Sequence, residues 1–363
     1  MNSLISNKFF VDNLLKWNRL SNNRLMPWKG EKNPYKIWLS EIILQQTRVN
    51  QGLEYYLRFV NKFPDVHALA NASENQVFKL WEGLGYYTRC KNLIASAKYI
   101  SQNLNGKFPE TYVDLLALKG VGPYTAAAIG SFAFNLPVAV VDGNVYRVLS
   151  RYFGMKNPVD STEGKEIFAE LANKLIDKKN PSIYNQALMD FGATICKPQL
   201  PVCVSCLLKK NCTAFTTNTV DQFPVKEKSI QIKNRWFYYL LIEFDGKWYV
   251  RKRKPKDIWE NLYEFVLMEE DNSLTEKKIV ANIKSKYFNN KETFVIKDIS
   301  KVNKQKLTHQ TIQGQFITIQ LKKKSAIKGF QLASPAALKK LPFPKFIANY
   351  LKDKSVSLNL GNA

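Results

Sequence analysis

Two acidic residues in contrasting surroundings are the first candidates for chemistry. Glu41 lies in an apolar helical stretch between Ile37 and Leu44, where its carboxyl group could stay protonated; the alternative is a rim position at which the carboxylate reaches water. Asp142 ends the apolar run 138–141 and opens a helix, where it could stay exposed and ionised; the alternative is a plain helix N-cap. Two carboxyl groups in opposed environments are typical of acid and base chemistry at a glycosidic bond.

A glycine turn followed by a helix precedes the second of these acids. Gly120 and Gly122 bracket a turn that we expect to be too tight for a Cβ, and Pro123 can occupy the first position of a helix. The N–H groups at the start of a helix carry a partial positive charge that suits a phosphate. No acidic side chain lies in the turn, so it predicts a phosphate contact, with Lys119 beside it as a second one.

Four cysteines lie close together, separated by six, two and five residues: Cys196, Cys203, Cys206 and Cys212. In a reducing compartment such a group indicates a metal site more often than disulfides. Zinc ribbons usually carry two C-x-x-C pairs separated by a longer gap, which differs from this single compact loop, although zinc stays open as an alternative.

The composition favours a polyanionic partner. The chain has 363 residues, a formal charge of +24 and a pI of about 9.7, and residues 301–350 carry ten lysines and no acidic residue. A lysine-heavy genome would explain part of this excess. The sequence contains no apolar segment long enough to span a membrane and no signal-peptide pattern, so we expect a cytoplasmic, nucleoid-associated monomer without membrane contact.

The pattern of elements predicts two domains and a linker. Residues 1–215 read as helical, including a helix from Tyr35 to Val49, and residues 216–234 read as a linker. Residues 235–355 read as a smaller α+β domain. Its expected strands are Trp236–Phe244, Lys247–Lys252, Phe294–Ile299 and Gln315–Leu321, and its expected helices are Leu274–Tyr287 and Ala336–Asp353, the latter interrupted near Pro342 and Pro344.

Dense motifs across residues 10–215 carry a family resemblance. They are Pro27-Trp28, Trp38-Leu39-Ser40-Glu41, Leu44-Gln45-Gln46-Thr47, Trp81-Glu82-Gly83-Leu84-Gly85-Tyr86-Tyr87, the glycine turn, Val141-Asp142-Gly143-Asn144 and the cysteine loop. With them the chain resembles the MutY-type adenine DNA glycosylases of the endonuclease III, or helix-hairpin-helix, superfamily. The resemblance implies a mainly α catalytic region with an iron–sulfur loop over residues 196–212, followed by a Nudix-like α+β domain.

The resemblance also implies roles and a substrate. Glu41 would protonate the leaving adenine and Asp142 would stabilise the sugar cation, with Tyr124 and Asn144 in support. The contacts to DNA or to a base would be Trp28, Gln46, Thr47, Leu84, Tyr86, Gly120, Gly122, Gln186, Thr308 and His309. The four cysteines would hold a [4Fe–4S] cluster. The partner would be duplex DNA with adenine opposite 8-oxoguanine or guanine, and the adenine would be rotated out of the stack.

The sequence differs from related families at two places, and these differences bear on which function it has. Tyr124 stands where endonuclease III-type enzymes place a lysine, and a phenol cannot form a Schiff base, so we expect base excision without strand cleavage. No Nudix hydrolase box follows Leu262-Tyr263-Glu264-Phe265, and Leu307-Thr308-His309 replaces the family's common Phe-Ser-His. The alternatives are a glycosylase/lyase for oxidised pyrimidines and a non-catalytic iron–sulfur protein that binds DNA.

Overall fold

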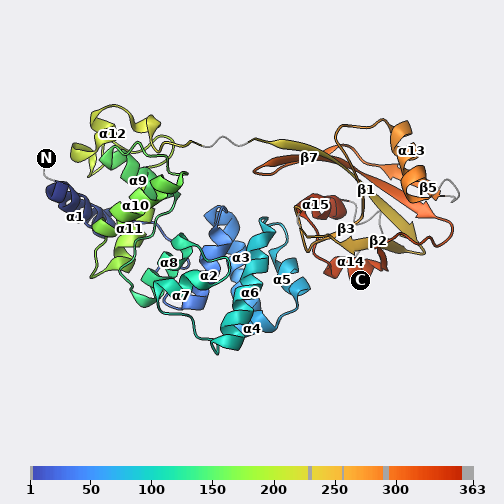
Figure 1. Ribbon diagram of the computed structural model, residues 1–363, viewed down its shortest axis with the longest axis horizontal. Helices are drawn as coiled ribbons and strands as arrows, with labels where there is room; N and C mark the ends of the chain where they lie inside the picture. The colour runs from blue at the N-terminus through green and yellow to red at the C-terminus, as the bar shows by residue number, and fades with distance from the viewer. Residues whose placement is uncertain (1–2, 228–230, 256, 289–293, 354–363) are drawn as a thin grey trace. The chain divides into compact units, whose positions relative to one another are not determined.

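The chain folds into two compact units. The computed structural model describes residues 3–227, 231–255, 257–288 and 294–353 (Figure 1). One unit comprises Met1–Asn71 with Asn92–Lys228, and the other comprises Ala72–Lys91 with Ser229–Ala363. The second unit therefore includes a helical segment from the first half of the sequence, which the expected boundaries assign to the first domain. Residues 228–230 of the expected linker and residues 354–355 of the expected second domain lie outside the described residues.

The first unit is helical. Its helices are α1 (Ser3–Ser21), α2 (Pro34–Leu44), α3 (Val49–Lys62), α4 (Val66–Asn71), α6 (Tyr87–Asn103, which starts in the other unit), α7 (Tyr112–Ala117), α8 (Pro123–Phe134), α9 (Gly143–Phe153), α10 (Thr162–Leu175), α11 (Pro181–Thr194) and α12 (Thr213–Thr216), with short 3₁₀ turns at Lys209–Asn211 and Val220–Gln222. The structure thus confirms the helical character expected for this part of the chain.

Local chemistry sets where α2 begins and ends. The Asn33 side chain accepts hydrogen bonds from the backbone N–H groups of Tyr35 and Lys36, which caps the helix. The expected helix continued to Val49, and this is wrong: α2 ends at Leu44 because Gln46 adopts the left-handed region, with φ of 55°. A new helix, α3, starts at Val49. The break places Gln45, Gln46 and Thr47 in a turn rather than on a helix face, and of these three only Gln46 is exposed.

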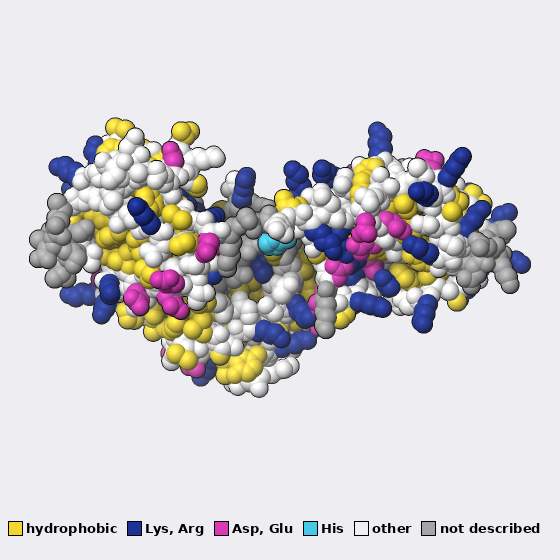
Figure 2. Space-filling view, turned by 45° about the horizontal axis from the view of Figure 1, so that its top comes forward, with side chains coloured by type: hydrophobic (Ala, Val, Ile, Leu, Met, Phe, Trp, Pro, Cys, Tyr) yellow, Lys and Arg dark blue, Asp and Glu magenta, His cyan; other side chains and the backbone are white. Residues whose placement is uncertain are grey.

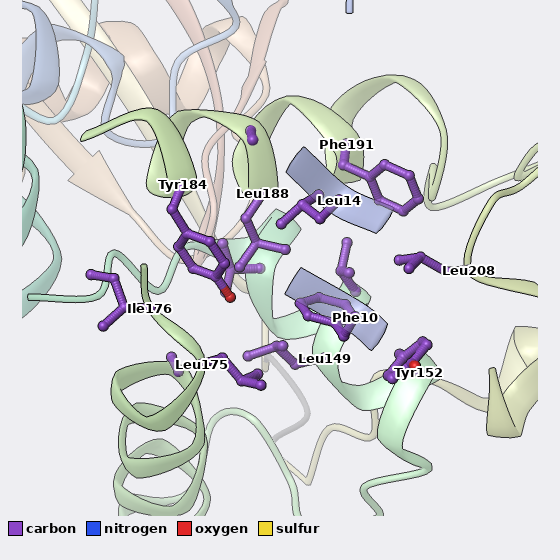
Figure 3. Close-up of a cluster of buried hydrophobic side chains, with 14 of the residues drawn as sticks. Phe10, Leu14, Leu149, Tyr152, Leu175, Ile176, Tyr184, Leu188, Phe191 and Leu208 are labelled. Atoms are coloured by element: carbon purple, nitrogen blue, oxygen red, sulfur yellow. The ribbon is translucent and has the colours of Figure 1, made fainter. Parts of the chain in front are cut away.

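An apolar core holds α9 and α11 together. It gathers side chains from α1, α9, α10 and α11, among them Phe10, Leu149, Tyr184 and Phe191, none of which is more than 2% exposed (Figure 3). Burying each such side chain contributes about 1.5–3 kcal/mol. This core fixes the start of α9, which carries Asp142 as its N-cap, against α11.

The second unit is built on a mixed eight-stranded sheet (Figure 1). Its main strand order is β3-β2-β1-β7-β5, in which β1 and β7 are parallel, while β4 pairs with β1, β6 with β7 and β8 with β2. The strands are β1 (Lys233–Phe244), β2 (Lys247–Lys252), β3 (Tyr263–Glu264), β4 (Val266–Glu270), β5 (Phe294–Ile299), β6 (Asn303–Lys306), β7 (Gln310–Leu321) and β8 (Gln331–Ala333); the helices are α5 (Glu74–Trp81), α13 (Glu276–Tyr287), α14 (Pro335–Lys340) and α15 (Lys345–Asp353).

The expected elements of this unit are confirmed with modest shifts of their ends. The hairpin at Asp245-Gly246 forms, since both residues adopt positive φ, and the helix expected over Ala336–Asp353 splits into α14 and α15 around the two prolines. The shorter strands β3, β4, β6 and β8 were not expected. A helical unit followed by a smaller α+β unit confirms the expected fold class. No helix in the described ranges is both long and apolar enough to cross a bilayer.

Candidate active site

Glu41 is buried near the end of α2. Only 7% of the residue is exposed, and the Tyr124 hydroxyl donates a hydrogen bond of 2.6 Å to its Oε2. Burial raises the pKa of Glu41 to about 7; the Tyr124 hydrogen bond lowers it, and the negative charge of Asp142 raises it further. The structure thus favours the buried position for Glu41 over the rim position, and a carboxyl group with this pKa can donate a proton near neutral pH.

Asp142 caps α9 and also faces the same space as Glu41. Its Oδ1 accepts hydrogen bonds from the backbone N–H groups of Asn144 at 2.9 Å and Val145 at 2.8 Å, and its Oδ2 accepts one from the Asn144 side chain at 2.7 Å. The expectation of an exposed carboxylate is wrong. Asp142 is half-buried and burial raises its pKa, while the hydrogen bonds from Val145 and Asn144 oppose that rise. These hydrogen bonds therefore offset part of the cost of ionising Asp142 at this position.

One cavity of about 360 Å³ brings together half of the fourteen residues that were expected to act in catalysis or to contact DNA. Seven of them line it: Trp28, Glu41, Thr47, Tyr124, Asp142, Asn144 and Gln186. Ligand pockets commonly measure roughly 300–1,000 Å³, so this space suits a planar base with part of its sugar. The cavity also has a cationic wall, which includes Arg24 and Lys29.

The glycine turn is only partly as expected. Gly120 has φ of +80°, and a Cβ there would lie 2.6 Å from Cβ of Asn92, so the position requires glycine. Gly122 has an ordinary φ of −95°, and a Cβ on it would meet no atom within 4 Å, so the expectation of a steric need at Gly122 is wrong. Gly122 is instead the N-cap of α8, and its open surroundings leave the first N–H groups of that helix accessible to a ligand.

The expected base contacts outside the cavity differ in accessibility. Gln46 is exposed and strained, at φ of 55°. In the second unit, Leu84 is only 6% exposed whereas Tyr86 is 43% exposed. The Tyr86 hydroxyl is hydrogen-bonded to the hydroxyl of Thr308, which lies with His309 in the exposed turn between β6 and β7. As the loop stands, Tyr86 can meet a base and Leu84 cannot.

Arg147, which the sequence analysis did not select, connects the site to the cysteine loop. Its guanidinium donates to Oδ1 of Asn144 at 2.8 Å, to the carbonyl of Gly192 at 2.7 Å and to the carbonyl of Cys196 at 2.7 Å. The Asn144 amide is therefore oriented from both ends, since its Nδ2 donates to Asp142. A basic residue on the buried face of α9 was the available sequence signal, because charged residues are rarely buried without a partner.

The four cysteines line one pocket with apolar neighbours that include Val148 and Leu208. Burial raises the pKa of the Cys206 thiol to about 11, and it also raises the pKa values of Cys203 and Cys212. Such thiols become thiolates only beside a strong positive charge. Among the described residues, no group of three or more Cys, His, Asp or Glu side chains is placed to hold a single metal ion.

Two family models match the chain. The model described as "HhH-GPD superfamily base excision DNA repair protein" matches residues 39–176, and the model described as "NUDIX domain" matches residues 237–353. The first range contains Glu41 and Asp142, and the second contains the β6–β7 turn.

Curated relatives extend over most of the chain. The adenine DNA glycosylase of Buchnera aphidicola subsp. Baizongia pistaciae (strain Bp) is 33% identical over 304 residues, which are 84% of this chain and 84% of the relative. The adenine DNA glycosylase of Homo sapiens is 39% identical over 214 residues, which are 56% of this chain and 39% of the relative.

Solved structures share the helical architecture. A thermostable thymine-DNA glycosylase superposes with a TM-score of 0.56 at 29% identity, covering 60% of this chain and 100% of that one. A trapped endonuclease III–DNA covalent intermediate superposes with a TM-score of 0.51 at 23% identity, covering 58% of this chain and 96% of that one, which shows a common fold.

Proposed function

We propose that this chain, which belongs to the adenine DNA glycosylase family of HhH-GPD base excision repair proteins, hydrolyses the N-glycosidic bond of adenine in duplex DNA. One observation carries the proposal. Glu41, whose pKa burial raises to about 7, shares a cavity of about 360 Å³ with Asp142. An acid that is protonated near neutral pH and a carboxylate opposite it are what this bond cleavage needs.

The proposed reaction follows from the two environments. Glu41 gives its proton to a ring nitrogen of the adenine, the bond from that base to C1′ breaks, and the base leaves neutral. The positive charge that develops on the sugar is stabilised by the Asp142 carboxylate, which its hydrogen bonds to Asn144 and Val145 keep in place. Water then adds to C1′ and releases a proton, which leaves an abasic site. The Tyr124 hydroxyl holds the Glu41 carboxyl group at 2.6 Å.

Tyr124 also supports a glycosylase without lyase activity. A lyase forms a Schiff base between an amine and C1′, and the residue that contacts Glu41 here is a phenol. Tyr124 lines the cavity itself, whereas Lys119 lies in the preceding turn and is not among the residues that line the cavity. Lys29 does line the cavity, and its Nζ is ion-paired with Asp190 at 3.0 Å. The chain is therefore proposed to release adenine and to leave the DNA strand intact.

The second unit is proposed to read the base opposite the adenine, which would be 8-oxoguanine or guanine. The support is an exposed surface where Tyr86 and Thr308 share a hydrogen bond next to His309. Hydroxyl and imidazole groups can both donate to and accept from the edge of a base. A Thr308→Ala variant should lower the preference for 8-oxoguanine over guanine, and an unchanged preference would remove Thr308 from this role.

A cytoplasmic, nucleoid-associated location stays a prediction.

A [4Fe–4S] cluster is proposed at Cys196, Cys203, Cys206 and Cys212. Four cysteines around one pocket would supply the four thiolates that a cluster of this kind takes. The cluster would cross-link the loop to the helical core, and its positive irons would keep the buried thiols ionised. Purified protein should absorb visible light and contain about four irons and four sulfides per chain. One zinc per chain would contradict the proposal.

A strand-nicking assay tests the function. Duplexes would carry adenine opposite 8-oxoguanine, adenine opposite guanine, thymine opposite guanine, or thymine glycol, each with and without alkali. We expect alkali-dependent nicks at adenine alone, and none with Glu41→Gln, which should still bind the duplex. Alkali-independent nicks at thymine glycol would favour the glycosylase/lyase alternative. Binding without release of any base would favour the non-catalytic alternative.

A further inference from the structure

A buried acid behind the cavity wall is used by none of the steps above. Asp190 lies on α11 and is 0% exposed. Its carboxylate accepts four hydrogen bonds from side chains: Asn22 at 2.9 Å, Arg24 at 2.8 Å, Lys29 at 3.0 Å and Gln186 at 2.9 Å. Two of these donors are cations, Arg24 and Lys29, which form ion pairs with the carboxylate, and a carboxylate oxygen in such a pair accepts hydrogen bonds.

The contact with Gln186 decides which way the amide of that side chain points. Gln186 lines the cavity, and its Nε2 donates to Oδ1 of Asp190. An amide has a donor end and an acceptor end, and a carboxylate that is paired with two cations accepts only the donor end. With one hydrogen of Nε2 directed at Asp190, the second hydrogen and the carbonyl oxygen form the edge that remains for a ligand.

That edge, a donor beside an acceptor, matches adenine. At the edge formed by its exocyclic amine and N1, adenine donates from the amine and accepts at N1, so a glutamine amide in this orientation can make two hydrogen bonds to it. Hypoxanthine presents the reverse pattern, with an oxygen in place of the amine and a ring N–H beside it. To match hypoxanthine, the Gln186 amide would have to turn over, which would set its carbonyl oxygen against the Asp190 carboxylate.

We propose that Asp190 is a positioning residue that locks the orientation of the Gln186 amide and thereby makes the cavity select a base with an exocyclic amine. This inference rests on the proposed adenine glycosylase function. If the Gln186 amide turned over, its carbonyl oxygen would face the Asp190 carboxylate and the hydrogen bond between the two side chains would be lost. The loss of such a hydrogen bond corresponds to about 10- to 100-fold in an equilibrium or rate ratio. Asp190 therefore raises the ratio of adenine to hypoxanthine release by that order.

The test compares single-turnover release of adenine and of hypoxanthine from duplexes that carry deoxyadenosine or deoxyinosine opposite the same base. The full chain is used as purified, with Asp190→Asn as the main variant, because an asparagine can offer either end of its own amide to a Gln186 that has turned over. We expect the ratio of the two rates to fall by about 10-fold or more relative to the unchanged chain. Adenine and hypoxanthine differ in how readily each leaves the sugar, but this difference cancels when the rate ratio of the variant is compared with that of the unchanged chain.

A matched control separates this role from simple support of the cavity wall. Asn22 contacts Oδ2 of Asp190 and is not among the residues that line the cavity, whereas Gln186 contacts Oδ1, so Asn22→Ala weakens the anchor and leaves the Gln186 contact in place. It should lower both rates alike and keep their ratio within about twofold. Asp190→Asn behaving in the same way would overturn the proposal.

Two further outcomes keep the test decisive. If Asp190→Asn does not fold, Gln186→Leu with Asp190 intact should still lower the ratio about 10-fold, and a retained ratio would overturn the proposal. In the Gln186→Leu background, a foldable Asp190→Asn should change the ratio no further, because the two residues act as a pair. Failure of the unchanged chain to release adenine would instead overturn the proposed function itself.

Discussion

The buried position of Glu41 costs the fold stability when the carboxyl group is ionised. Glu41 is enclosed at 7% exposure, and burial raises its pKa to about 7 from an ordinary value of 4.5. A carboxyl group shifted upward makes the folded state bind a proton more tightly than the unfolded state does. The stability linked to that proton is fully present below pH 4.5 and is lost as the pH rises through 7.

Glu41→Gln should therefore be more stable than the unchanged chain at high pH. A glutamine does not titrate, so the difference in unfolding free energy should be small near pH 4.5 and reach about 3 kcal/mol in favour of the variant above pH 7. Denaturant unfolding of both proteins at pH 5 and pH 8 measures it. If the difference in stability does not vary with pH, Glu41 is not a buried acid. Adenine release by the unchanged chain should also decline above pH 7, because Glu41 then loses the proton that it gives to the base.

At the scale of elements, the turn into α8 separates a structural glycine from an accessible one. Gly120 has φ of +80° and lies against Asn92, whereas Gly122 has an ordinary φ and open space around it. Only the second is free to approach a phosphate closely. α8 also carries Tyr124 in its first turn, so this element links the expected phosphate contact to the residue that holds Glu41.

Alanine should have different effects at these two positions: a loss of stability at Gly120 and a loss of affinity for DNA at Gly122. Gly120→Ala forces a left-handed backbone on alanine and a clash with Asn92, so we expect about 2 kcal/mol or more of lost stability. Gly122→Ala should cost less than about 1 kcal/mol, because only the cap preference changes, and should weaken duplex binding by crowding the α8 N-terminus. Thermal unfolding and binding to an undamaged duplex distinguish them. Unchanged affinity for Gly122→Ala would place the phosphate elsewhere.

At the scale of the whole molecule, charge favours the proposed partner. The chain carries 54 Lys and Arg against 30 Asp and Glu, and Figure 2 shows basic side chains spread over both units on the face in view. Ion pairs such as the bidentate pair of Arg235 with Glu269 and the contact of Arg253 with Asp257 use one charge of each sign, so they leave the excess of basic side chains unchanged. The surface left for a ligand is therefore basic.

Binding to duplex DNA should weaken steeply as salt increases. Each lysine or arginine that neutralises a phosphate contributes about −0.9 to the slope of log affinity against log salt, so about six contacts would give a slope near −5. Fluorescence anisotropy with an undamaged duplex between about 50 and 200 mM salt measures this slope. A flat response would mean that the basic composition reflects the codon usage of the source and not the function.

Several features could be predicted from the sequence because they depend on near neighbours. The helical surroundings of Glu41, the cap at Asp142, the Asp245-Gly246 hairpin and the strand Lys247–Lys252 all rest on patterns within a few residues, and each is present. The four cysteines also lie within 17 residues of one another, so their position around one pocket depends on a single loop. Local propensity and side-chain period determine such features.

Other features were decided only by tertiary structure. Three of them depend on which surfaces pack together: the end of α2 at Leu44, the burial of Asp142, and the grouping of Ala72–Lys91 with the second unit. The same holds for Asp190, whose partners Arg24 and Lys29 lie 166 and 161 residues away in the sequence. The sequence by itself determined which side chains are chemically capable, but packing between distant helices determined their neighbours, because no periodicity records which distant faces meet.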